Sequence, residues 1–412
     1  MASKRSKKEP SQLKTTNLKK YEKESKGAIN LNYYVFCQMK DKEWHKASII
    51  ECRLKDPSWE GREDLKEDSY QYYIHYENMN RRLDEWVDYE RLKKTNELVE
   101  DPLADPNKER ESDEEHEGLD LNQRKKHLEA TKIKTISNIQ IGVYQSETWY
   151  YAPFPQGFHN IDYLYFCEFC LNFYKFKEEL KIHVKNCPLS NPPGNEIYRD
   201  NVKKLSLWEV DGYKNPGYCE SLSYLAKLFL DHKWLYRTIS PFLFFVLTEN
   251  DQNGSHIVGY FSKSKDWNSD NNLSCILTLP FHQRKGYGKF LINMSYELSK
   301  IEGRSGTPER PLSDLGRITY MSFWTQKIIE YIREHPGEEI TLKKISEVTS
   351  IKLDDITDSL ERLDLLKKYN KQIYLCTDPE ILDQVYKKMG RPAIPIDGKK
   401  INWYPFKYKF VN

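Results

Sequence analysis

Four side chains in the middle of the chain have the residue types and the spacing of a metal site. They are Cys167, Cys170, His183 and Cys187. The first two flank a two-residue turn and the last two share one face of a helix, so all four can converge on a tetrahedral Zn²⁺. Tyr174 and Leu180 occupy the two apolar positions that form the minicore of a single ββα finger. We therefore predict a structural zinc module within residues 160–190; the alternative is unliganded, buried thiols.

The helix of this module has an unsuitable face for reading DNA. Finger helices contact bases through positions −1, 3 and 6, which are Phe176, Glu179 and Ile182 when His183 is the seventh helical residue. Two of these are apolar and one is acidic, and an acid repels phosphate. We expect this helix to pack against its own domain.

A second group of residues suits anion binding. Residues 275–280 form an apolar run that predicts a buried strand, and the basic segment 283–289 follows. Leu291, Met294 and Leu298 then lie on one face of a predicted helix. A strand, a glycine-containing turn and a helix start together present backbone N–H groups and a positive dipole end to an anion.

The glycine spacing narrows the class of anion. A dinucleotide fingerprint needs a glycine where Leu291 stands, and a Walker loop needs Ser or Thr where Phe290 stands. The remaining pattern is Gln283-x-x-Gly286-x-Gly288, the pyrophosphate loop of acetyl-CoA-dependent N-acetyltransferases. Taken alone the pattern is weak, because glycines in such a turn also serve packing.

The elements that must position these groups fall into four segments. The chain opens with a basic tail, residues 1–28, and short aromatic strands at 29–92 predict a small β-barrel. An acidic linker at 93–134 precedes an α+β domain at 135–405. Highly charged segments of this kind are usually disordered. The basic tail could also be a nuclear address or contact phosphates weakly.

Other bulk features favour a soluble, intracellular protein. The net charge is only +2 among 412 residues, and no apolar run is long enough to span a bilayer. The eight cysteines show no disulfide framework, which fits a reducing compartment. We expect no membrane partner.

Several long motifs resemble the MYST family of histone acetyltransferases over residues 29–92 and 137–405. They are residues 191–199, 228–233, 258–262, 275–280, 283–288 and 311–316. The N-terminal segment, with 75–76 and 81–86, is similar to the chromo-barrel (tudor-knot) module of that family. His282 departs from a usual Tyr, and Trp234 and 237–239 also depart from the family pattern. The departures put loop details in doubt but touch no site residue below.

The resemblance implies acetyl transfer from acetyl-CoA to lysine side chains of histone tails, with the H4 tail favoured. A lysine amine has a free pKa of about 10.4, so deprotonating it at pH 7 requires about 4–5 kcal/mol and hence a base. By resemblance that base is Glu309, and Cys275 lines the site. Direct attack by the amine is the expected route, and an acetyl-cysteine route through Cys275 stays open.

The resemblance also implies the residues that contact the cofactor and one modified side chain. Cofactor contacts are expected from Ile276, Leu277, Thr278, Gln283, Arg284, Lys285, Gly286, Tyr287, Gly288, Lys289, Ser313 and Ser322. Lys233 matches a lysine that family members acetylate on themselves; otherwise it is a surface lysine at a helix end. The family further implies a nuclear protein that acts on nucleosomes within a multiprotein complex.

Two modules flank this site. The barrel aromatics Tyr33, Tyr73, Tyr76, Trp86 and Tyr89 could form part of a methyl-lysine cage, but most are expected to fill the barrel core. Residues 317–405 are expected to be helical, with a helix-turn-helix-like pair whose second helix is too acidic to read DNA. We expect this region to complete the catalytic fold.

Two other functions remain open on the sequence. One is a chromatin-binding adaptor that has lost catalysis. The other is a small-molecule N-acetyltransferase that shares only the cofactor fold. The pairing of Glu309 with the glycine loop favours the histone acetyltransferase over the adaptor.

Overall fold

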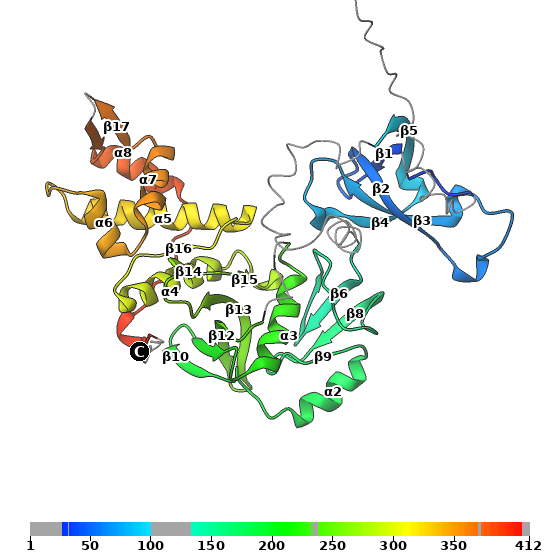
Figure 1. Cartoon of the computed structure of the whole chain (residues 1–412), viewed down its shortest axis with the longest axis horizontal. Coiled ribbons are helices and arrows are strands. Elements are labelled where there is room, and N and C mark those ends of the chain that lie inside the picture. The colour runs from blue at the N-terminus through cyan, green and yellow to red at the C-terminus, as the bar shows by residue number, and fades with distance from the viewer. Residues whose placement is uncertain are drawn as a thin grey trace, which may run out of the picture. The chain divides into compact units, whose positions relative to one another are not determined.

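The chain divides into two compact units, residues 1–133 and 134–412 (Figure 1). The computed structural model describes residues 27–31, 33–99, 133–231, 233, 238–369 and 372–405. The predicted basic tail and most of the predicted acidic linker lie outside the described residues.

The first unit is a small antiparallel β domain, as its aromatic strands predict. Its sheet has the strand order β4-β3-β2-β1-β5. The strands are β1 (Tyr33–Gln38), β2 (Trp44–Leu54), β3 (Tyr70–Tyr76), β4 (Glu85–Asp88) and β5 (Leu92–Leu98). Strand β5 continues beyond residue 92, the predicted end of this domain. The sequence did not indicate the continuation, because Leu92 is the only buried residue of the strand and no apolar pattern marks the rest.

The aromatic residues of this unit mainly form its core. Tyr73 and Tyr76 are fully buried, and the Tyr76 hydroxyl donates to Glu85 at 3.0 Å. The Arg53 guanidinium covers the Trp86 ring at 4.2 Å from its centre. The burial of Tyr73 and Tyr76 favours the core interpretation over a methyl-lysine cage for these two residues. Trp86 is partly exposed and packs against Tyr73 and Arg53.

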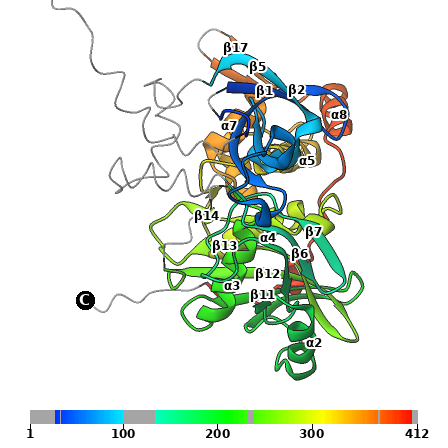
Figure 2. The ribbon, with the colours of Figure 1, turned by 90° about the vertical axis from the view of Figure 1, so that its right-hand side faces the viewer.

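The second unit opens with a four-stranded sheet that supports the zinc module. Its strand order is β7-β6-β8-β9, with β6 and β8 parallel. The elements are β6 (Ile136–Ile141), β7 (Tyr144–Glu147), β8 (Ile161–Phe166), β9 (Phe173–Tyr174) and helix α2 (Lys177–Asn186). Both views place α2 and the helices of residues 314–388 at opposite ends of this unit (Figures 1 and 2).

A five-stranded antiparallel sheet forms the centre of the second unit. Its order is β10-β11-β12-β13-β15. The strands are β10 (Asn195–Asp200), β11 (Leu205–Asp211), β12 (Phe242–Asp251), β13 (Gly254–Ser264) and β15 (Ile276–Thr278). Side chains alternate between its two faces. Phe245 and Leu247 join the core that includes α4 (Tyr287–Glu302), whereas Phe244 and Val246 join the core around α3 (Pro216–Lys227).

The last part of the second unit mixes helices with short strands. Two very short strands, β14 (Asn271–Leu273) and β16 (Thr307–Pro308), pair in parallel. The elements that follow are α5 (Asp314–Glu334), α6 (Leu342–Thr349), α7 (Leu353–Arg362), β17 (Leu366–Tyr369), β18 (Gln372–Leu375) and α8 (Pro379–Lys388). The predicted helix pair is present as α6 and α7. The expectation of a wholly helical region missed the β17–β18 hairpin, whose first strand is lysine-rich and lacks an apolar alternation.

The described part of the chain contains no helix that is both long enough and apolar enough to cross a membrane.

Candidate functional site

The four predicted metal ligands meet in one cluster. Their ligand atoms all lie within 4.8 Å of one another. Cys167 follows β8, and the positive φ of Leu171 (60°) turns the chain after Cys170. His183 lies on α2 and its Nε2 is 3.1 Å from the Cys170 Sγ, while Cys187 caps the helix. Three thiolates and one imidazole in this arrangement fit a structural, tetrahedral zinc site.

The zinc-module helix packs against its own domain, as predicted. It does so through Leu180, which lies against Cys167 and Cys170. Phe176 and Ile182, two of the three positions that a DNA-reading finger would use, are 61% and 68% exposed. The minicore needs only one apolar face of a short helix, so the opposite face is left in solvent.

Strand β15 offers backbone amides at the open edge of the central sheet. It pairs with β13 on one side and is the last strand of the order. On that side Cys275 accepts from Ser262 N–H at 2.8 Å, and Leu279 N–H donates to Val258 at 3.0 Å. Because bonding alternates along an antiparallel strand, the N–H groups of Ile276 and Thr278 face the open edge. A bound ligand can accept hydrogen bonds there.

The predicted loop joins this strand to the start of α4. The Gln283 side chain donates to the Thr278 carbonyl at 3.1 Å, which ties the loop to the strand end. Arg284 and Gly286 have left-handed φ values of 61° and 97°. Gly286 is the N-cap of α4 and provides no side-chain cap. The first-turn N–H groups of α4 are therefore left for another acceptor, as anion binding requires.

Gly288 keeps a space between β15 and the next helix. A Cβ built at this position would lie 3.6 Å from the Thr278 hydroxyl and 3.8 Å from the Thr319 methyl. The chain itself would tolerate a methyl group at these distances, so packing within the protein does not demand glycine. The exposed cations Arg284 and Lys285 stand on the same loop. Open amides, an uncapped helix start and two cations fit a diphosphate group.

The remaining loop residues and the two serines already have partners. Tyr287 donates to Glu249, and the Lys289 ammonium donates to the Arg391 carbonyl at 2.7 Å. Ser313 caps α5 by accepting from Gly316 N–H at 3.1 Å. The Ser322 hydroxyl donates to the Met389 carbonyl at 3.0 Å. Any contact of these groups with a cofactor has to use their remaining lone pairs or hydrogens.

His282, the residue that departs from the family pattern, is buried beside this loop. Its ring packs against Phe281, Tyr144 and Tyr287. Burial lowers the pKa of His282, so the ring is neutral at pH 7. The His282 ring is therefore part of an aromatic cluster that packs against the loop.

Glu309 is held by backbone bonds at the end of β16. Its N–H donates to the Leu273 carbonyl at 2.8 Å, and Thr307 N–H donates to the Asp270 carbonyl at 3.2 Å. The side chain of Glu309 is exposed. This pairing brings the predicted base to the segment that ends two residues before Cys275, so the structure brings Glu309 and β15 to the same region.

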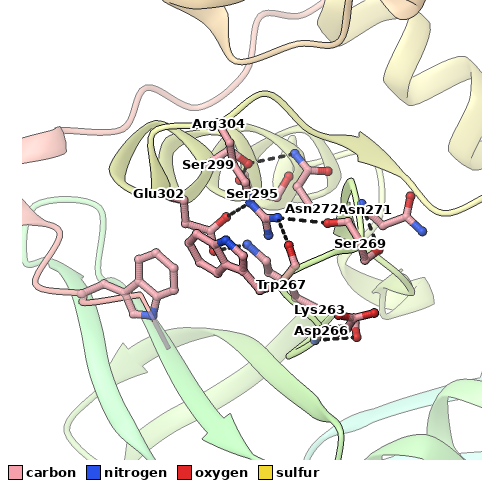
Figure 3. A network of polar contacts seen from close by, with 12 residues as sticks. Lys263, Asp266, Trp267, Ser269, Asn271, Asn272, Ser295, Ser299, Glu302 and Arg304 are labelled. Carbon is pink, nitrogen blue, oxygen red and sulfur yellow. Dashed lines mark hydrogen bonds and ion pairs between the residues drawn. The ribbon is translucent and has the colours of Figure 1, made fainter. Parts of the chain in front are cut away.

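A buried polar network holds the loop that leads into β14 (Figure 3). Glu302 bonds both Lys263 and Arg304, and its side chain is only 4% exposed. Arg304 in turn donates to the carbonyls of Trp267 and Ser269 at 2.8 and 3.0 Å. No local pattern predicted this network, because its members come from separate segments, 263–269 and 302–304.

Cys275 and Lys233 are neighbours. The Lys233 ammonium lies 3.8 Å from the Cys275 Sγ and 6.0 Å from the centre of the Tyr260 ring. Burial lowers the pKa of Lys233, but Cys275 and Tyr260 more than reverse this, so the pKa is raised. Lys233 is thus half-buried beside Cys275 and differs from an ordinary surface lysine.

Together these features define a zinc-containing α/β domain of the acyltransferase class, in which an edge strand, a glycine loop and a helix start form the place for a diphosphate-bearing cofactor. Residues 191–401 match the MOZ/SAS family, residues 133–187 match the MYST family zinc finger domain, and residues 29–94 match the RNA binding activity-knot of a chromodomain.

Relatives extend these matches over most of the chain. It is 46% identical to histone acetyltransferase of the MYST family 2 from Arabidopsis thaliana, over 90% of this chain and 85% of the relative. Histone acetyltransferase of the MYST family 1 from the same plant matches equally. The histone acetyltransferase Tip60 homolog of Caenorhabditis elegans is 38% identical over 95% of this chain and 93% of its own. The chain belongs to the MYST family of histone acetyltransferases, whose MOZ/SAS domain binds acetyl-CoA.

Proposed function

We propose that this chain is a histone acetyltransferase that moves the acetyl group of acetyl-CoA to lysine side chains of histones. The observation that carries the proposal is the parallel β14–β16 pair. It brings Glu309 to the segment that leads into Cys275 and the open edge of β15. A carboxylate beside amide donors is the arrangement that lysine acetylation needs.

Each part has a defined task in the reaction. Glu309 takes a proton from the substrate ammonium, which makes the amine nucleophilic. The bound acetyl-CoA supplies an activated thioester carbonyl. The N–H groups of Ile276 and Thr278 at the open edge hold the pantetheine arm and stabilise charge that develops on the carbonyl oxygen. The nitrogen–carbonyl carbon bond forms as the carbon–sulfur bond breaks. The second nitrogen proton passes to the departing sulfur, so that CoA leaves as the thiol.

We favour direct attack of the amine over an acetyl-cysteine route. Direct attack needs only Glu309 as a base, and Cys275 then lines the site. The Lys233 ammonium lies 3.8 Å from the Cys275 Sγ, and the covalent route through this thiol stays open for test. Lys233 is also the proposed site of autoacetylation.

The proposed setting is chromatin in the nucleus. Histone tails, with the H4 tail favoured, are the proposed substrates, and the chain is proposed to work as a subunit of a multiprotein nucleosome-acetylating complex. The small β domain and the basic tail would add weak contacts to nucleic acid or histone. Acetyl-CoA is the acetyl donor for this reaction, and zinc has a structural role.

The direct experiment combines the chain with labelled acetyl-CoA and whole nucleosomes and maps acetylated lysines by mass spectrometry. The proposal predicts label on histone tail lysines and on Lys233. Label on free polyamines but not on histones would favour a small-molecule acetyltransferase, and no transfer at all would favour an adaptor. Lys233→Arg is the control that separates autoacetylation from transfer to histones.

A further inference from the structure

The strand that carries Glu309 is held on a second side by the C-terminal helices. Gly306 N–H donates to the Ser350 carbonyl at 2.8 Å, and Gly306 forms a parallel bridge with Ile351. Ser350 and Ile351 form the turn between α6 and α7. Lys352, at the start of α7, pairs with Asp270 at 2.7 Å, just before β14. Strand β16 therefore lies between β14 and the α6–α7 turn.

One acidic residue of α7 is buried against this strand. Asp355 is 2% exposed, and its Oδ1 accepts from the Arg310 guanidinium at 2.7 Å. Its Oδ2 is buried and has no hydrogen-bond partner within the described part of the chain. Burial raises the pKa of Asp355 in spite of a side-chain hydrogen bond with Thr307 and the adjacent Arg310 guanidinium. A buried carboxylate is costly unless it is paired, and the partners of Asp355 are Thr307 and Arg310, which lie on either side of Glu309 in the sequence. These contacts point to a role beside Glu309.

The position of Arg310 suggests what that role is. Arg310 directly follows Glu309, and the β14–β16 ladder extends to the Glu309 N–H. Arg310 lies in a bend just after β16, and its side chain is 60% exposed. Its bond to Asp355 ties the residue that directly follows Glu309 to α7. This tie limits the positions that the backbone of Glu309, and hence its carboxylate, can take.

We propose that Asp355 is a positioning residue for the general base, which acts through Arg310 to orient the Glu309 carboxylate toward the acceptor lysine. This inference rests on the proposed function. It gives the acidic helix α7 a role in acetyl transfer. The sequence of α7 alone shows only that this helix is unsuited to reading DNA. The α6–α7 segment then forms one wall of the base loop.

The test compares Asp355→Asn with the matched control Asp354→Asn, which removes the same charge from the exposed neighbouring residue. Steady-state kinetics use acetyl-CoA and a histone H4-tail peptide, with the melting temperature measured in parallel. We expect kcat of Asp355→Asn to fall by about 10- to 100-fold, because a small misplacement of a catalytic group has that effect. The KM for acetyl-CoA should stay unchanged, and the control should match the wild type.

A double-mutant cycle tests whether the effect passes through Arg310. In an Arg310→Gln background Asp355→Asn should lower kcat no further, because coupled residues are not additive. Arg310→Lys should retain more kcat than Arg310→Gln, since it keeps the charge. If Asp355→Asn does not fold, the comparison of Arg310→Lys with Arg310→Gln tests the proposal instead. Wild-type kcat in both Arg310 variants would overturn it.

Failure of the positioning role and failure of the base assignment give different results. Wild-type kcat in Asp355→Asn, alongside an inactive Glu309→Gln, would overturn the positioning role and leave the base in place. Wild-type kcat in Glu309→Gln would contradict the base assignment itself.

Discussion

The backbone N–H of Glu309 donates a hydrogen bond to the carbonyl oxygen of Leu273 at 2.8 Å. This bond joins two segments that are far apart in the sequence, and it sets the proposed base near the strand whose open-edge amides are the proposed cofactor contacts. The rest of the site is built around it. The polar network of Glu302 and Arg304 holds the loop before Leu273, and Asp355 holds the residue after Glu309.

A methyl group at Gly288 should weaken cofactor binding without unfolding the protein. A Cβ there meets no protein atom closer than 3.6 Å, so Gly288→Ala should keep its melting temperature. The same methyl would occupy space near the proposed diphosphate, and we expect the Kd for acetyl-CoA, measured by calorimetry, to rise about tenfold, or about 1.4 kcal/mol.

The matched control for this variant is Gly217→Ala, the corresponding second residue of α3, where a Cβ meets nothing within 4 Å. Its Kd and melting temperature should both stay close to wild type. A Gly288→Ala protein with unchanged affinity would place the cofactor elsewhere.

Removal of one zinc ligand should empty the metal site and destabilise the second unit. Cys170→Ser removes the thiolate 3.1 Å from the His183 ring, and three ligands hold zinc poorly. Metal analysis should show about one zinc ion per wild-type chain and almost none in the variant, with a melting temperature about 5–10 °C lower. Cys376→Ser, which alters a half-buried thiol outside the cluster, should change neither value. Full zinc content in Cys170→Ser would argue against the four-ligand site.

The ion pairs of His256 should make stability depend on pH. His256 lies between Glu168 at 2.7 Å and Asp251 at 2.9 Å. Burial lowers the pKa of His256, but the two carboxylates outweigh burial and raise it above the ordinary value of 6.5. Because the folded protein favours the charged ring, the stabilisation is complete below pH 6.5 and is lost as pH rises through the folded pKa.

Thermal melts at pH 6 and pH 9 measure this effect. The melting temperature of His256→Gln should fall further below wild type at pH 6 than at pH 9. His159→Gln is the control, because His159 bonds a neutral carbonyl at 2.8 Å and should show no such difference. An equal deficit at both pH values would mean that the charge of His256 contributes nothing.

Local sequence patterns predicted the parts of the site that lie close together in the chain. The zinc ligands and the glycine loop each lie within a turn or a helix, where spacing in the sequence determines spacing in the fold. Their residue types and spacing were therefore enough to predict both sites. The resemblance to a family supplied Glu309, which as an isolated residue is one exposed glutamate among many. Its assignment as the base stays a prediction.

Contacts between distant segments could not be read from the sequence. Arg310 and Asp355 are 45 residues apart, and Lys233 and Cys275 are 42 apart. No periodicity or spacing links such pairs, because the fold alone brings them together. The β17–β18 hairpin was missed for another reason: its strands are short and carry too little apolar pattern to be placed from the sequence.

The most direct test of the account is the kcat of Glu309→Gln at saturating acetyl-CoA and histone H4-tail peptide. Glutamine keeps the shape of the side chain but cannot accept the ammonium proton, so we expect kcat to fall by about 10²- to 10⁴-fold. The Kd for acetyl-CoA should be unchanged, and Glu347→Gln, an exposed glutamate on α6, should have normal kcat. A Glu309→Gln protein that folds, binds acetyl-CoA and retains wild-type kcat would contradict the claim that this carboxylate is the base.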